Sequence, residues 1–272
     1  MPVNYASRYS NIVDERFKAA SMTQTATNDN FDFVGVRTVN VYSVSTSPMN
    51  DYTMSGANRY GIPAELENTT QELTLNQDRS FTFTIDRRNN IDTMMVMEGG
   101  RALRRQLDEV VTPEIDTYTL ATIAAGAGNT VTAAITRTNA YEAFLDGVTT
   151  LKRAKAPLAG TVAFINSNFY KQIRLDDSFI QASDIAQNML VSGQVGAIEN
   201  IPLVFADIGI MPAGVEFMLS NRIAVTRPMK IGEYFVHENP PGISGQLVEG
   251  RFYYDCFVLN NKKNVIYVHK GV

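Results

Sequence analysis

Tryptophan is absent from the 272 residues, which contain only one cysteine and two histidines. The single Cys256 excludes an intrachain disulfide, and its aromatic and branched neighbours predict a buried strand. A chain without disulfides is typical of a reducing cytosol. His237 and His269 each lie in a strand-like run, which favours a hydrogen-bonded structural role over general-base catalysis, and two histidines do not make a metal site.

Runs of like charge and long apolar runs are missing as well. The 24 Lys and Arg residues nearly balance the 28 Asp and Glu residues, giving a net charge of −4. This balance argues against a protein that binds nucleic acid by releasing counterions, so any contact with DNA is expected to be weak and nonspecific. Residues 1–10 lack the apolar core of a signal peptide, and no apolar run reaches the length of a membrane helix. We therefore expect neither secretion by a signal peptide nor a membrane partner.

Catalytic motifs are not evident either. Gly126 and Gly128 follow a predicted helix, whereas a phosphate-binding loop precedes one, so they indicate a helix end. Asp176 and Asp177 are adjacent in a polar connection, which is typical of a solvated loop or a helix cap rather than an acid–base pair. We predict no enzyme activity, no cofactor and no metal site.

The most informative segment extends from Phe31 to Asp86 and has the pattern of one outstretched two-stranded arm. Residues 33–44 are rich in Val and Thr, and on the return limb Phe81 and Phe83 alternate with Ser and Thr, which is typical of β-strands. A limb of roughly 13 residues reaches ~43 Å, whereas a compact body of this length has a radius of only ~24 Å. Because an isolated two-stranded ribbon is marginally stable in water, the arm predicts contacts with a neighbouring subunit.

The two ends of this arm differ in character. Its tip, residues 46–68, is rich in Pro, Gly, Asn and Asp, so we expect it to be irregular, and mobile when nothing holds it. Before the arm, residues 7–20 place Tyr9 and Phe17 on one helical face. This face indicates either a tethered amphipathic segment or a helix folded back on its own core.

A spine of two helices is predicted after the arm. Asn90 can cap a helix of about 21 residues, ~30 Å long, in which Gly99 and Gly100 favour bending. Thr112 then caps a second helix, which ends within residues 124–128. Charged pairs at helical spacing are Glu98 with Arg101, Arg104 with Asp108 and Arg105 with Glu109. These charges either form a solvated face or make ion pairs with a neighbouring subunit.

The second half of the chain alternates helix and strand signals and predicts an α+β lobe. Asn139 with Glu142 forms a capping-box pattern, and Ser167 can cap a helix through Ile173. A further helix is expected after Ser183. Strands are predicted at residues 161–165, 202–205, 215–219, 222–225, 233–237, 247–259 and 264–269, with a tight turn near Asn261.

Specific phrases near the end of the chain resemble the major capsid proteins of tailed bacteriophages. They are Asn221-Arg222, the run from Glu233 to His237, Gly250-Arg251-Phe252-Tyr253-Tyr254-Asp255 and Tyr267-Val268-His269. The order of an N-terminal arm, a long extended loop and a spine helix leading into residues 110–116 is similar to the same family, so the resemblance spans nearly the whole chain.

The resemblance implies the α+β Hong Kong 97-like fold, with an N-arm, an extended β-hairpin loop, a long kinked spine helix in a peripheral domain, and an axial domain. On that map residues 1–32 form the N-arm and 33–88 the extended loop. Residues 89–138 and 222–258 form the peripheral domain, and 139–221 and 259–272 the axial domain. Implied inter-subunit contacts are Tyr9, Phe17, Tyr52, Arg59, Tyr60, Glu65, Glu67, Arg101, Arg104, Arg105, Asp108 and Glu109.

The implied function is that of a major capsid protein. Copies would assemble into pentamers and hexamers of an icosahedral or prolate head that encloses double-stranded DNA. The implied location is the virion, after assembly in the host bacterial cytoplasm. A portal and a separate scaffolding protein are the expected partners, the latter because Met1 lies almost directly before the arm, and a decoration protein is a further candidate.

One departure from the family and three alternatives follow. Some relatives join subunits by an isopeptide bond from a Lys on the extended loop, but no Lys lies between Lys18 and Lys152, so no such crosslink is expected. An encapsulin, the shell of a cellular compartment with the same fold, is the nearest alternative. An α+β enzyme and another virion component, such as a decoration or tail protein, are the others.

Overall fold

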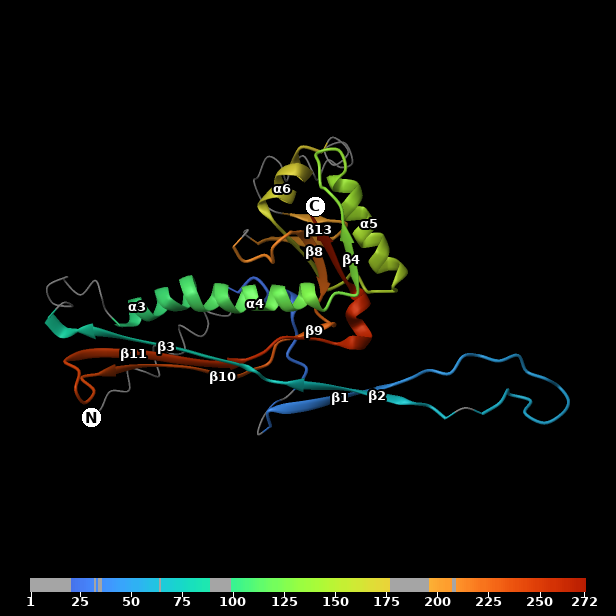
Figure 1. Cartoon of the computed structure of the whole chain (residues 1–272), viewed down its shortest axis with the longest axis horizontal. Coiled ribbons are helices and arrows are strands. Elements are labelled where there is room, and N and C mark those ends of the chain that lie inside the picture. Colours follow the sequence, from blue (N-terminus) through green and yellow to red (C-terminus); the bar gives the residue numbers. More distant parts are fainter. Residues whose placement is uncertain are drawn as a thin grey trace.

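The computed structural model describes residues 21–31, 33, 36–63, 65–88, 99–176, 196–206 and 209–272. Within them a hairpin projects from a body in which a long helix lies along one sheet, below a lobe with a second sheet (Figure 1). The mixture confirms the expected α+β class. The helices expected at residues 7–20 and after Ser183, the cap at Asn90, and the side chains of Tyr9 and Phe17 lie outside the described residues.

The projecting hairpin consists of β1 (Thr38–Val44) and β2 (Asn68–Thr74), which pair antiparallel from Thr38↔Thr74 to Val44↔Asn68. The Ser45 amide adds one more cross-strand bond, to the Glu67 carbonyl at 3.0 Å. Beyond it, the described residues of the tip form no helix or strand, as predicted from their turn-forming composition.

The predicted return limb was wrong. Phe81 and Phe83 lie on β3 (Gln77–Asp86), which pairs with β11 (Gly245–Tyr254) rather than with β1. Both rings pack against the cluster beneath the spine helix, an apolar surface that a free hairpin does not offer. Alternation in a sequence shows that one face of a strand is apolar, but it does not identify the neighbouring strand.

The spine is continuous through the predicted break. It runs as α3 (Gly99–Gln106), a π-helical segment Leu107–Val111, and α4 (Thr112–Ala125). Thr112 does not cap α4, and its amide instead bonds the Leu107 carbonyl in the wider π turn. This widened turn directly precedes Pro113, whose ring would clash with the carbonyl four residues earlier in a regular α-helix.

The spine packs against a three-stranded sheet in the order β10-β11-β3, where β10 is Met229–Glu238. Its buried side chains meet those of β11 in one cluster: Leu103, Leu107, Val111, Ile115, Val248, Phe252 and Tyr254. Gly250 leaves room for the Phe81 ring on the neighbouring strand, because a Cβ there would lie 2.6 Å from that ring. The sheet therefore has one apolar face, and this face lies on the spine.

The lobe is built on a six-stranded sheet in the order β4-β13-β8-β5-β7-β6. Its strands are β4 (Asn129–Thr132), β5 (Thr161–Ile165), β6 (Ala197–Ile198), β7 (Ile201–Phe205), β8 (Val215–Asn221) and β13 (Ile266–Lys270). Helices α5 (Ala140–Arg153) and α6 (Ser167–Arg174) cover one face, and α4 contributes to the core on the other. The spine ends at Ala125 and passes through Gly126 and Gly128 into β4, which confirms the predicted helix end.

Several local predictions need correction. Asn139 does not cap α5; its Oδ1 accepts from the amide and hydroxyl of Thr136, while Asp176 accepts from the Tyr141 amide. Asn166, not Ser167, caps α6 by accepting from the Phe169 amide at 2.7 Å. Such short polar side chains compete for nearby backbone groups, so spacing alone does not select the cap.

Three predicted C-terminal strands differ in extent from the observed ones. Only β9 (Val225–Thr226) overlaps the run expected at 222–225, and the run expected at 247–259 divides into β11 and β12 (Phe257–Val258), whereas β10 is longer than the run expected at 233–237. Cys256 is buried but lies between these two strands rather than in one. In place of a tight turn near Asn261, a 3₁₀ helix η3 (Asn260–Val265) leads into β13. A shorter 3₁₀ helix, η1 (Gln24–Ala26), lies in the N-terminal segment.

Both histidines have structural partners. His269 is buried, with Nε2 3.0 Å from the Ala133 carbonyl oxygen and its ring stacked on Phe217. His237 Nε2 lies 2.8 Å from Glu249 Oε1 on the exposed side of the three-stranded sheet. None of the helices in the described parts of the chain is long and apolar enough to cross a membrane.

Candidate functional site: the projecting hairpin and its junctions

The tip of the hairpin exposes apolar side chains. Met49 is fully exposed, and Met54, Tyr60 and Ile62 are each more than 80% exposed. Tyr52 and Tyr60 meet edge to face, with ring centroids 5.1 Å apart, yet Tyr52 remains 54% exposed. The two tyrosines therefore contact each other and are not buried against the body. Exposed apolar side chains of this kind are typical of interaction surfaces.

The polar residues predicted at the tip have local partners. The Arg59 carbonyl accepts from the Thr53 amide at 3.0 Å, and the Arg59 side chain donates to the Gly56 carbonyl at 3.4 Å. Glu65 and Glu67 are exposed on the returning chain. The tip thus folds on itself as a loop that carries its acidic side chains toward solvent.

The root of the hairpin is fixed by a small apolar cluster. Phe33, Leu73, Leu75 and Leu259 are all less than 8% exposed and contact one another. The Phe33 ring stacks on Phe257 with centroids 6.3 Å apart. Two residues of β2 and its continuation thereby join the hairpin to β12 and η3.

A buried carboxylate strengthens this root. Asp255 is 2% exposed and accepts hydrogen bonds from the Tyr118 hydroxyl at 2.6 Å, the Asn76 amide at 2.9 Å and the Cys256 amide at 2.7 Å. Burial, and then the neighbouring Asp255 carboxylate, raise the pKa of Tyr118 to about 12. Asp255 therefore connects the spine helix to the chain between β2 and β3.

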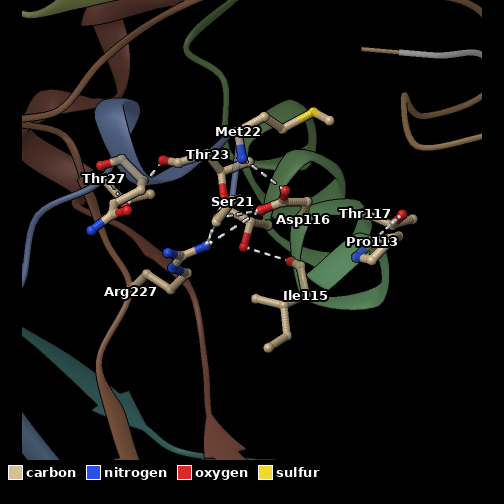
Figure 2. Close-up of polar contacts among 11 residues, drawn as sticks. Ser21, Met22, Thr23, Thr27, Pro113, Ile115, Asp116, Thr117 and Arg227 are labelled. Carbon is tan, nitrogen blue, oxygen red and sulfur yellow. Dashed lines mark hydrogen bonds and ion pairs between the residues drawn. The ribbon is translucent and has the colours of Figure 1, made fainter. Parts of the chain in front are cut away.

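A second buried carboxylate fastens the N-terminal segment to the spine (Figure 2). Asp116 on α4 accepts from Ser21 Oγ at 2.7 Å, the Met22 amide at 3.0 Å and Thr23 Oγ1 at 2.5 Å. The Arg227 guanidinium lies 3.5 Å from Asp116 and donates to both hydroxyls, at 3.2 and 2.6 Å. The carboxylate is 1% exposed and is satisfied by groups from two other parts of the chain, residues 21–23 and Arg227.

The next residues continue this attachment. The Asn28 amide donates to the Val225 carbonyl at 2.9 Å, and the Asn28 carbonyl accepts from the Arg227 amide and the Thr226 hydroxyl, both at 3.0 Å. Residues 21–28 are consequently fixed across α4 and β9.

The charged residues predicted on the spine are exposed. Arg105 and Glu109 form the expected pair at 2.8 Å, with both side chains more than half exposed. Arg101 and Asp108 are exposed as well, and Arg104 is partly buried. Glu98 lies outside the described residues. The partner of Glu114, Arg79 on β3 at 2.7 Å, was not predicted, because it is distant in the sequence.

The outer face of the three-stranded sheet carries another ion pair. Arg251 binds Asp78 through two hydrogen bonds of 3.0 and 2.6 Å. The hydrogen bonds and charge of Arg251 lower the pKa of the Asp78 carboxyl. In the described parts of the chain no three His, Cys, Asp or Glu side chains lie together in a way that could hold a metal ion.

Comparisons with known proteins agree with this architecture. The profile of the phage capsid protein family matches residues 67–266. The structure is similar to one from Mycobacterium phage Che8, with 16% identity, a TM-score of 0.74, and 92% and 90% of the two chains covered. A search of curated proteins by sequence returns no match.

Two further solved structures are similar. The capsid of cyanophage P-SCSP1u has 12% identity and a TM-score of 0.69, with 91% of this chain and 86% of that chain covered. A virus-like particle from Pyrococcus furiosus has 9% identity and a TM-score of 0.59, with 98% and 100% covered.

Proposed function

The chain belongs to the phage capsid protein family, and from this premise we propose that it is the major capsid protein of a tailed phage, forming pentamers and hexamers around double-stranded DNA. It has the Hong Kong 97-like fold and is a capsid shell protein, not an enzyme. Self-association follows from that role. The observation that best supports the finer proposal is the hairpin whose tip presents Met49, Met54, Tyr60 and Ile62 to solvent, as a surface for a second copy.

The proposed division of the chain into domains follows the arrangement of the family. Residues 1–32 would be the N-arm and 33–88 the extended loop, with a peripheral domain at 89–138 and 222–258 and an axial domain at 139–221 and 259–272. Two strand pairings cross these boundaries. β3, within residues 33–88, pairs with β11 of the proposed peripheral domain, and β4, within residues 89–138, pairs with β13 of the proposed axial domain. The proposed inter-subunit contacts are Tyr9 and Phe17 on the N-arm, and Tyr52, Arg59, Tyr60, Glu65 and Glu67 on the extended loop. Those proposed on the spine are Arg101, Arg104, Arg105, Asp108 and Glu109.

We also propose the partners of this shell. A portal and a separate scaffolding protein would take part in assembly in the host bacterial cytoplasm, and a decoration protein is a further candidate. The net charge of −4 supports weak, nonspecific contact with the enclosed DNA. The finished location would be the virion.

The test is to remove the tip while retaining the hairpin. Residues 46–66 are replaced by Asn-Gly, which can join Ser45 to Glu67 because their backbones already form the last cross-strand bond. The variant should fold, with an unchanged circular dichroism spectrum, but should form no stable closed shells in electron micrographs. Closed shells of normal size would contradict the proposal.

A second variant separates the apolar contacts of the tip from its length. Met54→Gln, Tyr60→Gln and Ile62→Gln together keep the full loop but remove three of its most exposed apolar side chains. We expect assembly to require a higher protein concentration than for the unchanged chain, measured by light scattering. Ser55→Gln, an exposed tip residue without apolar surface, is the matched control and should assemble normally.

The second candidate is a shell of the encapsulin type. The similarity to the virus-like particle from Pyrococcus furiosus, over the whole of that chain, favours it. The contents of purified particles distinguish the two functions. Nuclease-protected DNA supports the phage capsid, whereas a co-purifying protein cargo without DNA supports the compartment.

A further inference from the structure

The hairpin is packed at its root but only lightly held farther out. Leu73 and Leu75 are fully buried at the root. Beyond them, a crevice of about 240 Å³ separates the hairpin from η3. It is lined by Phe31, Val41, Thr69, Gln71, Asn260 and Lys262, among others. Since apolar packing does not fill this space, polar contacts across it add to the apolar root in setting the angle at which the hairpin leaves the body.

The side-chain amide of Gln71 makes the central contact. Its Nε2 donates to the Val258 carbonyl at 2.9 Å, and its Oε1 accepts from the Asn260 amide at 2.9 Å. The two bonds pair one side chain with the backbone on both sides of Leu259, as a neighbouring strand would do. Two residues farther toward the tip, Asn261 Nδ2 donates to Ser43 Oγ on β1.

A small change at this point becomes large at the tip. The chain continues for about 15 residues from Gln71 to the end of the loop, up to ~50 Å away at 3.3 Å per residue. A rotation of about 10° would then displace the tip by ~9 Å, whereas apolar side chains make contact only within ~4.5 Å. Subunit stability depends little on such a rotation, but a contact with another copy depends on it strongly.

We propose that Gln71 is a positioning residue that sets the direction of the hairpin through its two bonds to the backbone flanking Leu259. The directional role concerns the single subunit. Its consequence for assembly rests on the proposed function, because it requires the tip to meet a second copy.

Gln71→Met tests the directional role, because methionine keeps the length and removes both bonds. Nitroxide labels on Ser55→Cys at the tip and Thr149→Cys on α5 report the distance by pulsed electron resonance, with unlabelled chain in excess. Cys256 is 3% exposed and should not take up the label in the folded chain. The distance distribution should broaden about twofold, and the melting temperature should fall by less than about 3 °C.

The control is Gln172→Met, a similarly half-exposed glutamine on α6, which should change neither quantity. An unchanged distance distribution in Gln71→Met would overturn the proposal. A fall in melting temperature above about 6 °C without broadening would also overturn it, since Gln71 would then be a stability residue.

Assembly is measured separately on unlabelled chain. The yield of closed, uniform shells from Gln71→Met should fall at least tenfold and that from Gln172→Met should not. If the distances broaden while shells form normally, the directional role holds and the dependence of assembly on the direction of the hairpin is overturned. That result is distinguishable from a failure of both.

Discussion

Among single residues, Asp116 contributes most clearly to holding separate segments together. Replacing it with Ala leaves the Arg227 guanidinium, which is only 11% exposed, without its carboxylate. Breaking a buried pair in this way costs about 3–5 kcal/mol of unfolding free energy. Urea denaturation of Asp116→Ala should show a loss of this size.

The control for Asp116 is an exposed pair on the same spine. Glu109→Ala removes the partner of Arg105, and both side chains are more than half exposed, so the loss should be only about 0.3–0.5 kcal/mol. Equal losses for the two variants would mean that the contacts of Asp116 with Ser21, Thr23 and Arg227 do not stabilise the fold.

Cys256 makes the free energy of unfolding depend on pH in the alkaline range. Burial raises the pKa of its thiol from 9.0 to about 12. Between these values the unfolded chain loses the thiol proton while the folded chain keeps it. The contribution is therefore intact below pH 9 and is lost as pH rises toward 12, up to about 4 kcal/mol in total. Tyr118, Tyr254 and Tyr267, whose pKa values are each raised to about 12, act in the same direction above pH 10.

Comparison with Cys256→Ala isolates the thiol in this alkaline loss. From pH 7.5 to 10.5 the unchanged chain should lose about 2 kcal/mol more unfolding free energy than the variant, in guanidinium titrations. Parallel losses in the two proteins would show that the thiol ionises as easily in the folded chain as in the unfolded one.

At the level of helices, Thr112 distinguishes a continuous spine from two capped helices. The residue is 5% exposed, and its hydroxyl has no hydrogen-bond partner among the described residues. Thr112→Val should therefore be neutral or stabilise the fold by about 1 kcal/mol, whereas loss of an N-cap would cost about 1 kcal/mol. Thermal unfolding of the variant measures the sign, and a clear loss would restore the capping interpretation.

The helices and strands show which features of the fold local sequence patterns predict. The first strand of the hairpin, the strand at residues 161–165 and the helix end at Gly126 follow from alternation and turn chemistry within a few residues, whereas the return strand β2 was not predicted. The partner of β3 does not follow from them either, because Phe81 pairs with Gly250, which is distant in the sequence. Asp116 and Asp255 were missed for the same reason, since their donors Ser21, Thr23 and Asn76 come from other parts of the chain.

For the whole molecule, the two buried carboxylates connect the parts that would reach other copies. Asp116 holds the N-terminal segment to α4, and Asp255 holds the root of the hairpin to the same helix through Tyr118. The described N-terminal segment and the root of the hairpin are thus both fixed to one spine. In a shell built from many weak contacts, attachment to the same helix would keep the two segments in a fixed orientation relative to each other, so that both could contact neighbouring copies at the same time.

These contacts should remain noncovalent in the finished particle. An isopeptide bond between subunits requires a Lys amine, and residues 19–151, which include the hairpin and spine, contain none. Particles boiled in detergent should therefore give a single band at 30.1 kDa. A ladder of larger covalent species would contradict this. A shell without such a bond should depend on subunit concentration for its stability, so dilution before heating should lower the dissociation temperature.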